Sequence, residues 1–264
     1  MRITLTFFVF LFFSSNLISQ DYIKKSFKKN SDSIPYRILF PKNFSPNKEY
    51  PLLVFLHGAG ERGNDNDYQL YHGSNYFLNY EFRNAFPSII VFPQCPKNSY
   101  WANIKGIPNP KYPTQKNSFS NNLPNNQQLL ILESLMSYLE KNYKINSNKR
   151  YIAGLSMGGM GAFELIARNP NYFAAGIAVC GGANPKWAKF FKNTPVWIFH
   201  GMRDNVVPPE LSINMFDAIK IHNPESKLTL YENVGHNSWD QALKEADIMS
   251  WLFSHEKEEF LLNN

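Results

Sequence analysis

The chain has 264 residues, of which 44% are hydrophobic, 16% aromatic and 18% charged. This composition excludes an intrinsically disordered protein and suits one α/β domain with a full-sized core. The formal net charge is +6, but no nucleic-acid-binding motif accompanies it, so we expect no nucleic-acid partner.

The first twenty residues differ in kind from the rest. Arg2 gives one positive charge, residues 4–13 are mostly Leu, Phe, Val and Ile, and small polar residues follow. This pattern predicts a secretory signal peptide over residues 1–20, cut near Ser19 or Gln20, and a single domain over 21–264. A membrane anchor is the alternative, but the apolar run is shorter than the roughly 20 residues of a spanning helix. We therefore expect a secreted or periplasmic protein without stable membrane insertion.

Much of the positive charge lies just after the predicted cut, at Lys24, Lys25, Lys28 and Lys29. Such a cluster can attract an acidic polymer or surface. A solvated, partly disordered start is the simpler interpretation, and we prefer it.

Short apolar runs without polar alternation predict strands that are buried on both faces. An edge strand is expected at 36–40 and a last strand at 228–231, and the buried runs between them are 52–57, 88–93, 150–155, 173–180 and 196–200. Helical spacing appears at 123–141, with Asn122 as a possible cap, and at 159–168, 208–221 and 239–253. This alternation predicts an α/β fold with a doubly wound, mostly parallel sheet flanked by helices.

One long stretch, residues 94–121, has no strong pattern and is rich in Asn, Pro, Lys and Ser. Because it leaves the carboxyl end of a strand, we favour a substrate-binding flap over a decorated surface loop. Trp101 in this stretch and Trp239 near the C-terminus are candidates for substrate contact, as is Trp187 less strongly. Their alternative is a place in the core.

The strongest local signal is the segment Gly154-Leu155-Ser156-Met157-Gly158-Gly159. It follows a predicted strand and precedes a predicted helix, which is the context of a nucleophile elbow. A sharp strand-to-helix turn presses the two backbones together, so the neighbours of the serine must lack side chains. The segment predicts that Ser156 is a nucleophile; a glycine-rich turn without chemistry is the alternative.

A serine needs a base and an orienting acid, and both are expected later in the chain in the order acid, then histidine. Asp204 follows the strand at 196–200, and His236 follows the last strand. Helix capping or turn formation is the alternative role for Asp204, and a structural role is the alternative for His236. His57 and His200 also end strands, where we expect structural hydrogen bonds.

The segment His57-Gly58-Ala59-Gly60 follows the first buried strand and is a candidate oxyanion loop. In this geometry one donor is the amide after the nucleophile, here Met157, and the other comes from the early loop. We assign the second donor to Ala59, with Gly60 as the runner-up. No Cys/His cluster or H-E-x-x-H motif is present, so no metal site is expected. Whether Cys95 and Cys180 form a disulfide is left open.

On these motifs the chain resembles the α/β-hydrolase superfamily, and more narrowly the dienelactone-hydrolase-like, feruloyl or acetyl-xylan esterase-like and prolyl-oligopeptidase-like catalytic domains. The resemblance implies a serine carboxylesterase with a two-step acyl-enzyme route and no metal or organic cofactor. Its substrate would be a small-molecule or polysaccharide-linked ester. A serine peptidase that uses the same residues, and a non-catalytic binding module on the same scaffold, are the alternatives.

Overall fold

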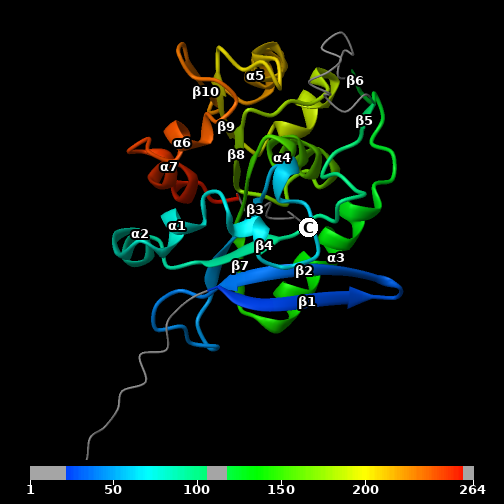
Figure 1. The fold of residues 1–264 in the computed structure, drawn as a ribbon. Helices are drawn as coiled ribbons and strands as arrows, with labels where there is room; N and C mark the ends of the chain where they lie inside the picture. The colour runs from blue at the N-terminus through cyan, green and yellow to red at the C-terminus, as the bar shows by residue number, and fades with distance from the viewer. Residues whose placement is uncertain (1–21, 106–117, 258–264) are drawn as a thin grey trace, which may run out of the picture.

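The computed structural model describes residues 22–105 and 118–257. They form an eight-stranded sheet in the order β1-β2-β4-β3-β7-β8-β9-β10 (Figure 1), together with a two-stranded ribbon of β5 and β6. The strands are β1 (Ile23–Lys29), β2 (Asp32–Leu39), β3 (Tyr50–Leu56), β4 (Ile89–Pro93), β5 (Ile104–Lys105), β6 (Ser118–Phe119), β7 (Ile145–Leu155), β8 (Ala175–Val179), β9 (Val196–Gly201) and β10 (Lys227–Tyr231). The strands β4, β3, β7, β8, β9 and β10 are parallel neighbours, whereas β1 and β2 are antiparallel additions at one edge. The predicted fold class is confirmed.

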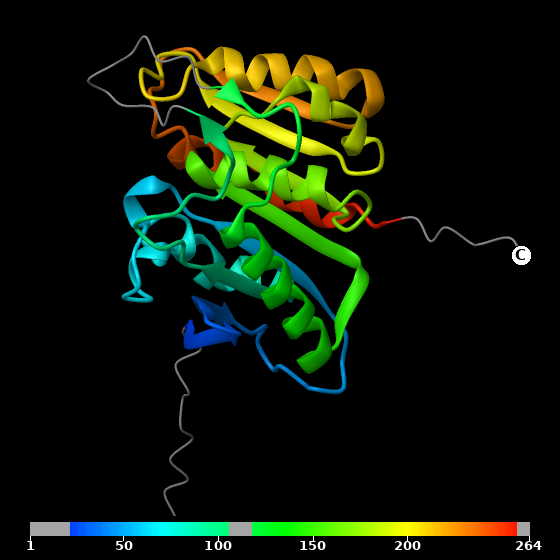
Figure 2. The same cartoon turned by 90° about the vertical axis from the view of Figure 1, so that its right-hand side faces the viewer.

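Helices cover both faces of the sheet. The α-helices are α1 (Ser74–Leu78), α2 (Tyr80–Ala85), α3 (Gln127–Asn142), α4 (Met157–Arg168), α5 (Pro209–His222), α6 (Trp239–Ala242) and α7 (Ile248–Ser254), and the 3-10 helices are η1 (Ala59–Glu61), η2 (Tyr68–Leu70) and η3 (Pro185–Phe191). Buried side chains of α3, α4, η3 and α5 belong to one core cluster, and those of α1, α2, α6 and α7 to another. Figure 2 shows the face of the sheet that is covered by the first group of helices, with α3, α4 and α5 in front of the strands. Among residues 22–105 and 118–257, no helix combines the length and the apolar character needed to cross a bilayer.

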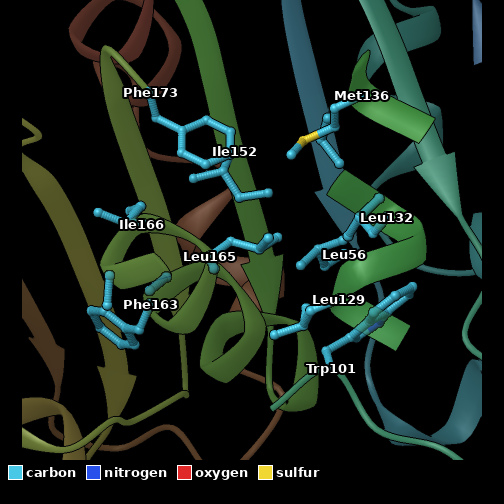
Figure 3. Close-up of a cluster of buried hydrophobic side chains, with 14 of the residues drawn as sticks. Leu56, Trp101, Leu129, Leu132, Met136, Ile152, Phe163, Leu165, Ile166 and Phe173 are labelled. Atoms are coloured by element: carbon cyan, nitrogen blue, oxygen red, sulfur yellow. The ribbon is translucent and has the colours of Figure 1, made fainter. Parts of the chain in front are cut away.

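Successive residues of the central strands enter opposite cores. In β3, Leu52, Val54 and Leu56 pack under α3 and α4, while Leu53 and Phe55 pack on the other side. Figure 3 shows the first core, where side chains of β3 and β7 meet those of α3 and α4. Both strand faces are therefore dry, which explains why these segments are apolar without alternation.

Helix α4 begins two residues before its predicted start and α5 is shifted by one residue, whereas the other two predicted helices differ more. Helix α3 begins at Gln127, because Asn126 caps it with a side-chain oxygen that accepts a hydrogen bond from the Leu129 amide at 3.1 Å. The segment predicted as one helix at 239–253 forms two short helices, α6 and α7, which are separated by residues 243–247.

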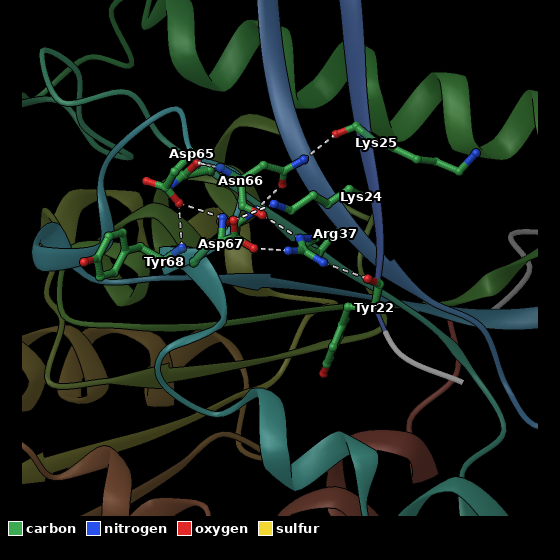
Figure 4. A network of polar contacts seen from close by, with 10 residues as sticks. Tyr22, Lys24, Lys25, Arg37, Asp65, Asn66, Asp67 and Tyr68 are labelled. Atoms are coloured by element: carbon green, nitrogen blue, oxygen red, sulfur yellow. Dashed lines mark hydrogen bonds and ion pairs between the residues drawn. The ribbon is translucent and has the colours of Figure 1, made fainter. Parts of the chain in front are cut away.

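The lysine-rich start is a strand whose four lysines are exposed, so the expected solvation is confirmed and the expected partial disorder is wrong. Strand β1 forms a hairpin with β2, and a polar network ties the hairpin to the 65–68 segment (Figure 4). Arg37 in β2 donates to the carbonyl of Asn66 at 2.5 Å and pairs with Asp67, which also pairs with Lys24 at 2.5 Å. Backbone pairing along β1 and these contacts provide the order that lysine composition alone does not indicate. The predicted signal peptide lies outside the described residues.

The sheet register brings the carboxyl ends of five strands into line. Leu56 at the end of β3 pairs with Gly154 in β7, and Leu155 pairs with Val179 at the end of β8. Val179 in turn pairs with Phe199 in β9, and the last residue of β10 pairs with Gly201. The segments that follow these strands therefore begin at one rim of the sheet, where α/β folds bind ligands.

Candidate active site

Ser156 occupies a strained turn between β7 and α4. Its backbone has φ 52° and ψ −118°, a left-handed region that L-residues rarely adopt. The amide of Ser156 donates to the carbonyl of Val179 at 2.8 Å, which ties the turn to β8. Backbone strain of this kind persists only where the surrounding structure enforces it, and it is concentrated at functional sites.

Two glycines make the turn possible. A Cβ on Gly158 would lie 2.0 Å from the carbonyl oxygen of Leu56, and one on Gly154 would lie 2.2 Å from that of Gly158. Both contacts are with backbone atoms, which cannot move aside without shifting β3 or α4. The glycines thus allow the helix to start directly against the strands, with Ser156 at the top.

The structure brings the three predicted side chains together. The Oγ atom of Ser156 lies 2.9 Å from Nε2 of His236, and Nδ1 of His236 lies 2.7 Å from Oδ2 of Asp204. The residues come from the segments that follow β7, β10 and β9. Asp204 also has the turn-forming role that was an alternative, because its Oδ1 accepts from the amides of Val206 at 2.8 Å and Val207 at 2.9 Å. The arrangement can draw a proton from the serine and stabilise the resulting imidazolium.

Asp204 is held in its ionised form. Burial of the carboxyl by itself raises its pKa, but hydrogen bonds from His200, His236 and the Val207 amide outweigh burial and hold the pKa well below its usual range. Asp204 is therefore negatively charged at neutral pH.

A cavity of about 280 Å³ opens at Ser156 and His236. Ala59, the first residue of η1, lines it, and Met157 is the first residue of α4, directly after the serine. The Met157 side chain is fully buried, so the residue can offer only its backbone amide at this place. Both residues assigned as oxyanion donors thus begin helices at the site: Met157 directly follows Ser156, and Ala59 lines the same cavity.

The loop that carries Ala59 is fixed by two side chains. Nδ1 of His57 donates to the carbonyl of Gly58 at 2.6 Å, and Nε2 of His57 accepts from the amide of Cys95 at 3.0 Å. Arg62 donates through Nε to the carbonyl of Ala59 at 2.9 Å. The expectation of a structural hydrogen bond at His57 is confirmed, and the bond restrains the candidate oxyanion loop.

The walls of the cavity differ partly from the prediction. Trp239 lines the cavity as expected, whereas Trp101 does not, which corrects its assignment to substrate contact. Trp101 is fully buried beside Leu56 and Leu129 in the core (Figure 3), because Gly161 in α4 leaves room for it. Trp187 is likewise buried in η3.

The residue before Trp101 lines the cavity instead, so the 94–121 stretch contributes Tyr100 to this wall. Residues 106–117 of the predicted flap lie outside the described residues. Glu61 and His72 also line the cavity, with Oε1 of Glu61 3.7 Å from Nε2 of His72. Sequence reasoning missed these three residues, since none of them ends a strand. The sequence held one signal for them: Glu61 directly follows the Gly-rich motif that was assigned to the oxyanion loop.

Cys180, Asp204 and His236 place potential metal-ligating atoms within 4.8 Å of one another. The group does not fit a metal centre. Burial raises the pKa of the Cys180 thiol far above its usual range, so the sulfur keeps its proton, and both ring nitrogens of His236 already have hydrogen-bond partners. Cys95 and Cys180 are both buried free thiols, so they form no disulfide.

Replacing Gly158 with alanine should destabilise the fold by more than about 2 kcal/mol, because the new methyl group overlaps the Leu56 carbonyl. The matched control is Gly60→Ala, where the Cβ meets nothing within 4 Å and the change should stay within about 0.5 kcal/mol. Urea unfolding of both variants measures the difference. Equal stability of the two variants would contradict the close contact described here.

Acid should loosen the structure through His57. Burial lowers the pKa of His57 to about 4, whereas the unfolded chain titrates near its ordinary value of about 6.5. Between these values the unfolded state binds more protons, so stability falls as pH falls, by about 3 kcal/mol over the window.

The measurement is the unfolding free energy as a function of pH between 7 and 4. The variant His57→Gln, which lacks a titrating ring, should show a flatter dependence over this window. A slope as steep as that of the native protein would show that His57 is not its source.

The chain is similar to known esterases. Residues 44–251 match the phospholipase/carboxylesterase family. A thermostable esterase of known crystal structure is 33% identical and superposes with a TM-score of 0.79 over 90% of this chain and 64% of that one.

Two curated proteins are also similar. The bifunctional acetylxylan esterase/xylanase of Neocallimastix patriciarum is 26% identical over 63% of this chain, and a protein of Aspergillus oryzae named "Probable feruloyl esterase C" is 22% identical over 71% of it. The chain spans 21% and 61% of the lengths of these two proteins, respectively. Taken with the eight-stranded sheet, the family match shows that this chain belongs to the phospholipase/carboxylesterase family of α/β-hydrolases.

Proposed function

We propose that this protein is a secreted serine esterase that hydrolyses carboxylic esters through an acyl-enzyme on Ser156. The observation that carries the proposal is the continuous hydrogen-bonded chain from Ser156 through His236 to Asp204, which begins at a strained turn and opens into a cavity. Membership of a carboxylesterase family supports the same chemistry.

In the first step His236 accepts the proton of Ser156 through Nε2 while the serine oxygen attacks the ester carbonyl. Asp204 accepts a hydrogen bond from Nδ1, which fixes the imidazole tautomer and stabilises the imidazolium. The amides of Met157 and Ala59 donate to the oxyanion that forms on the carbonyl oxygen.

Release of the alcohol completes the first half of the reaction, and in the second half water takes the place of the serine as nucleophile. The tetrahedral intermediate collapses, His236 donates its proton to the leaving alcohol, and the acyl group remains on Ser156. His236 then takes a proton from water, which attacks the acyl-enzyme. The second tetrahedral intermediate collapses, the acid leaves, and His236 returns the proton to the Ser156 oxygen. Because Asp204 stays ionised, the base is available in both halves.

The cavity favours a small acyl group. Its volume of about 280 Å³ lies just below the usual range for ligand sites of about 300–1,000 Å³, and Leu155, Val206 and Val207 give it an apolar wall. This suits a short or single-ring acyl group better than a long chain. The name of one curated relative, an acetylxylan esterase/xylanase, supports an ester attached to a polysaccharide, and the name of the other, a probable feruloyl esterase, supports a single-ring acyl group. The basic and apolar first twenty residues support secretion.

The nucleophile is tested with Ser156→Ala. This variant should lose nearly all turnover of p-nitrophenyl acetate and all covalent labelling by a fluorophosphonate, while its melting temperature stays near that of the native protein. The control is Ser137→Ala, which changes an exposed hydroxyl on α3 and should keep both activities. Labelling that persists in Ser156→Ala would refute the assignment.

The substrate class is tested with a panel of p-nitrophenyl esters from acetate to decanoate, together with feruloyl and acetylated-polysaccharide esters and peptide substrates. Short or single-ring acyl esters should give the highest kcat/KM, because the cavity is small. Faster cleavage of peptides would favour the peptidase alternative, and absence of turnover with intact folding would favour a binding module.

A further inference from the structure

A second histidine contacts the proposed catalytic acid. His200, the next-to-last residue of β9, is fully buried, and its Nε2 lies 3.1 Å from Oδ2 of Asp204. The same oxygen atom accepts a hydrogen bond from Nδ1 of His236 at 2.7 Å. One carboxylate oxygen is therefore shared between two imidazoles, only one of which reaches Ser156.

The other contacts of His200 show where its protons lie. Nε2 also lies 3.0 Å from the carbonyl of Val207, and because both of its partners can only accept, Nε2 must carry a hydrogen. Nδ1 lies 2.7 Å from the hydroxyl of Ser212, which in turn lies 2.9 Å from the carbonyl of Gly181.

The hydroxyl of Ser212 has a single hydrogen. If that hydrogen goes to Gly181, Nδ1 must donate as well and His200 is an imidazolium; if it goes to Nδ1, the ring is neutral. In both states His200 donates to Asp204, so the contact does not depend on which state prevails.

We propose that His200 is a positioning residue that sets the basicity of His236 by sharing Oδ2 of Asp204. This inference rests on the proposed function. A second donor on the oxygen takes up part of the negative charge that would otherwise stabilise protonated His236. His200 thereby keeps the base unprotonated at lower pH, and it holds the carboxylate in line with His236.

Few other ionisable groups of the described residues face this network. Cys180, at the end of β8, has its sulfur within 4.8 Å of the nearest ligand atoms of Asp204 and His236, and it remains a neutral thiol because burial raises its pKa. Across the cavity, the His72 and Glu61 pair is separated from His236 by the Trp239 ring, which lies 4.9 Å from the His72 ring and 5.4 Å from the His236 ring. Helix α5 offers the uncharged hydroxyl of Ser212.

Two amide substitutions distinguish the contact made by Nε2 of His200 from the contact made by Nδ1. His200→Gln places an amide near Nε2 and keeps a donor toward Asp204, whereas His200→Asn places one near Nδ1 and keeps only the contact with Ser212. The readout is kcat/KM for p-nitrophenyl acetate as a function of pH. We expect His200→Asn to move the acid limb upward by about 0.5–1 pH unit, and His200→Gln to return it toward the native position.

A surface control and a second variant complete the experiment. His222→Asn, on the exposed last turn of α5, should leave the profile unchanged. Ser212→Ala removes the partner of Nδ1 and leaves every group that contacts Asp204 in place. Because Ser212 anchors Nδ1 of the ring, its loss should let the His200 ring turn away from Asp204 and weaken the contact at Nε2. Ser212→Ala should therefore also move the acid limb upward, by less than His200→Asn, and it keeps the proposal testable if His200→Asn does not fold.

A lower plateau with an unmoved acid limb, in His200→Asn or in Ser212→Ala, would show a merely structural role and overturn the inference. The proposed function fails separately. If the native protein shows no ester hydrolysis that depends on Ser156, the esterase proposal is wrong. If the native protein is an active esterase but neither His200→Asn nor Ser212→Ala moves the acid limb, only the role of His200 is contradicted.

Discussion

The close backbone contact among β3, β7 and the first turn of α4 is the constraint on which the site depends. Because Gly154 and Gly158 have no side chains, α4 starts directly above the strands. Ser156, in the turn between β7 and α4, then adopts a positive φ. The contact fixes Ser156 relative to Leu56, and therefore relative to the loop that begins at His57. Nucleophile and oxyanion loop are thus positioned by the same packing, and the rest of the site is arranged around them.

Burial of charge is the second constraint. Asp204 lies in a dry environment, where an unpaired carboxylate is costly, and every oxygen accepts at least two hydrogen bonds from backbone amides or imidazoles. These donors come from its own loop, from β9 and from the loop after β10. The acid therefore also joins the last two parallel strands at their carboxyl ends, so catalytic geometry and local stability share the same bonds.

The sequence contains enough information for the sheet and for the Ser156, Asp204 and His236 arrangement, because both depend on local rules. Buried strands are apolar, the elbow requires glycine, and polar residues directly after parallel strands must meet at one rim. What lines the cavity depends instead on which loop side chain turns inward. Tyr100 and Trp101 are adjacent and aromatic, yet one lines the cavity and the other fills a space beside Gly161. Such a choice depends on packing partners that are distant in the chain, as does the order of the lysine-rich strand β1.

The cavity walls have a further consequence for how this scaffold can change. Glu61, His72, Tyr100 and Trp239 come from segments outside the sheet, whereas the elbow is locked by backbone contacts. Mutations at His72 and Tyr100 can reshape the cavity without disturbing the reacting atoms, whereas Glu61 shares η1 with Ala59 and the Trp239 ring packs against His236. Divergence toward new esters, in nature or in directed evolution, should therefore be concentrated in the loops, and libraries that spare the two elbow glycines should retain a high fraction of folded members.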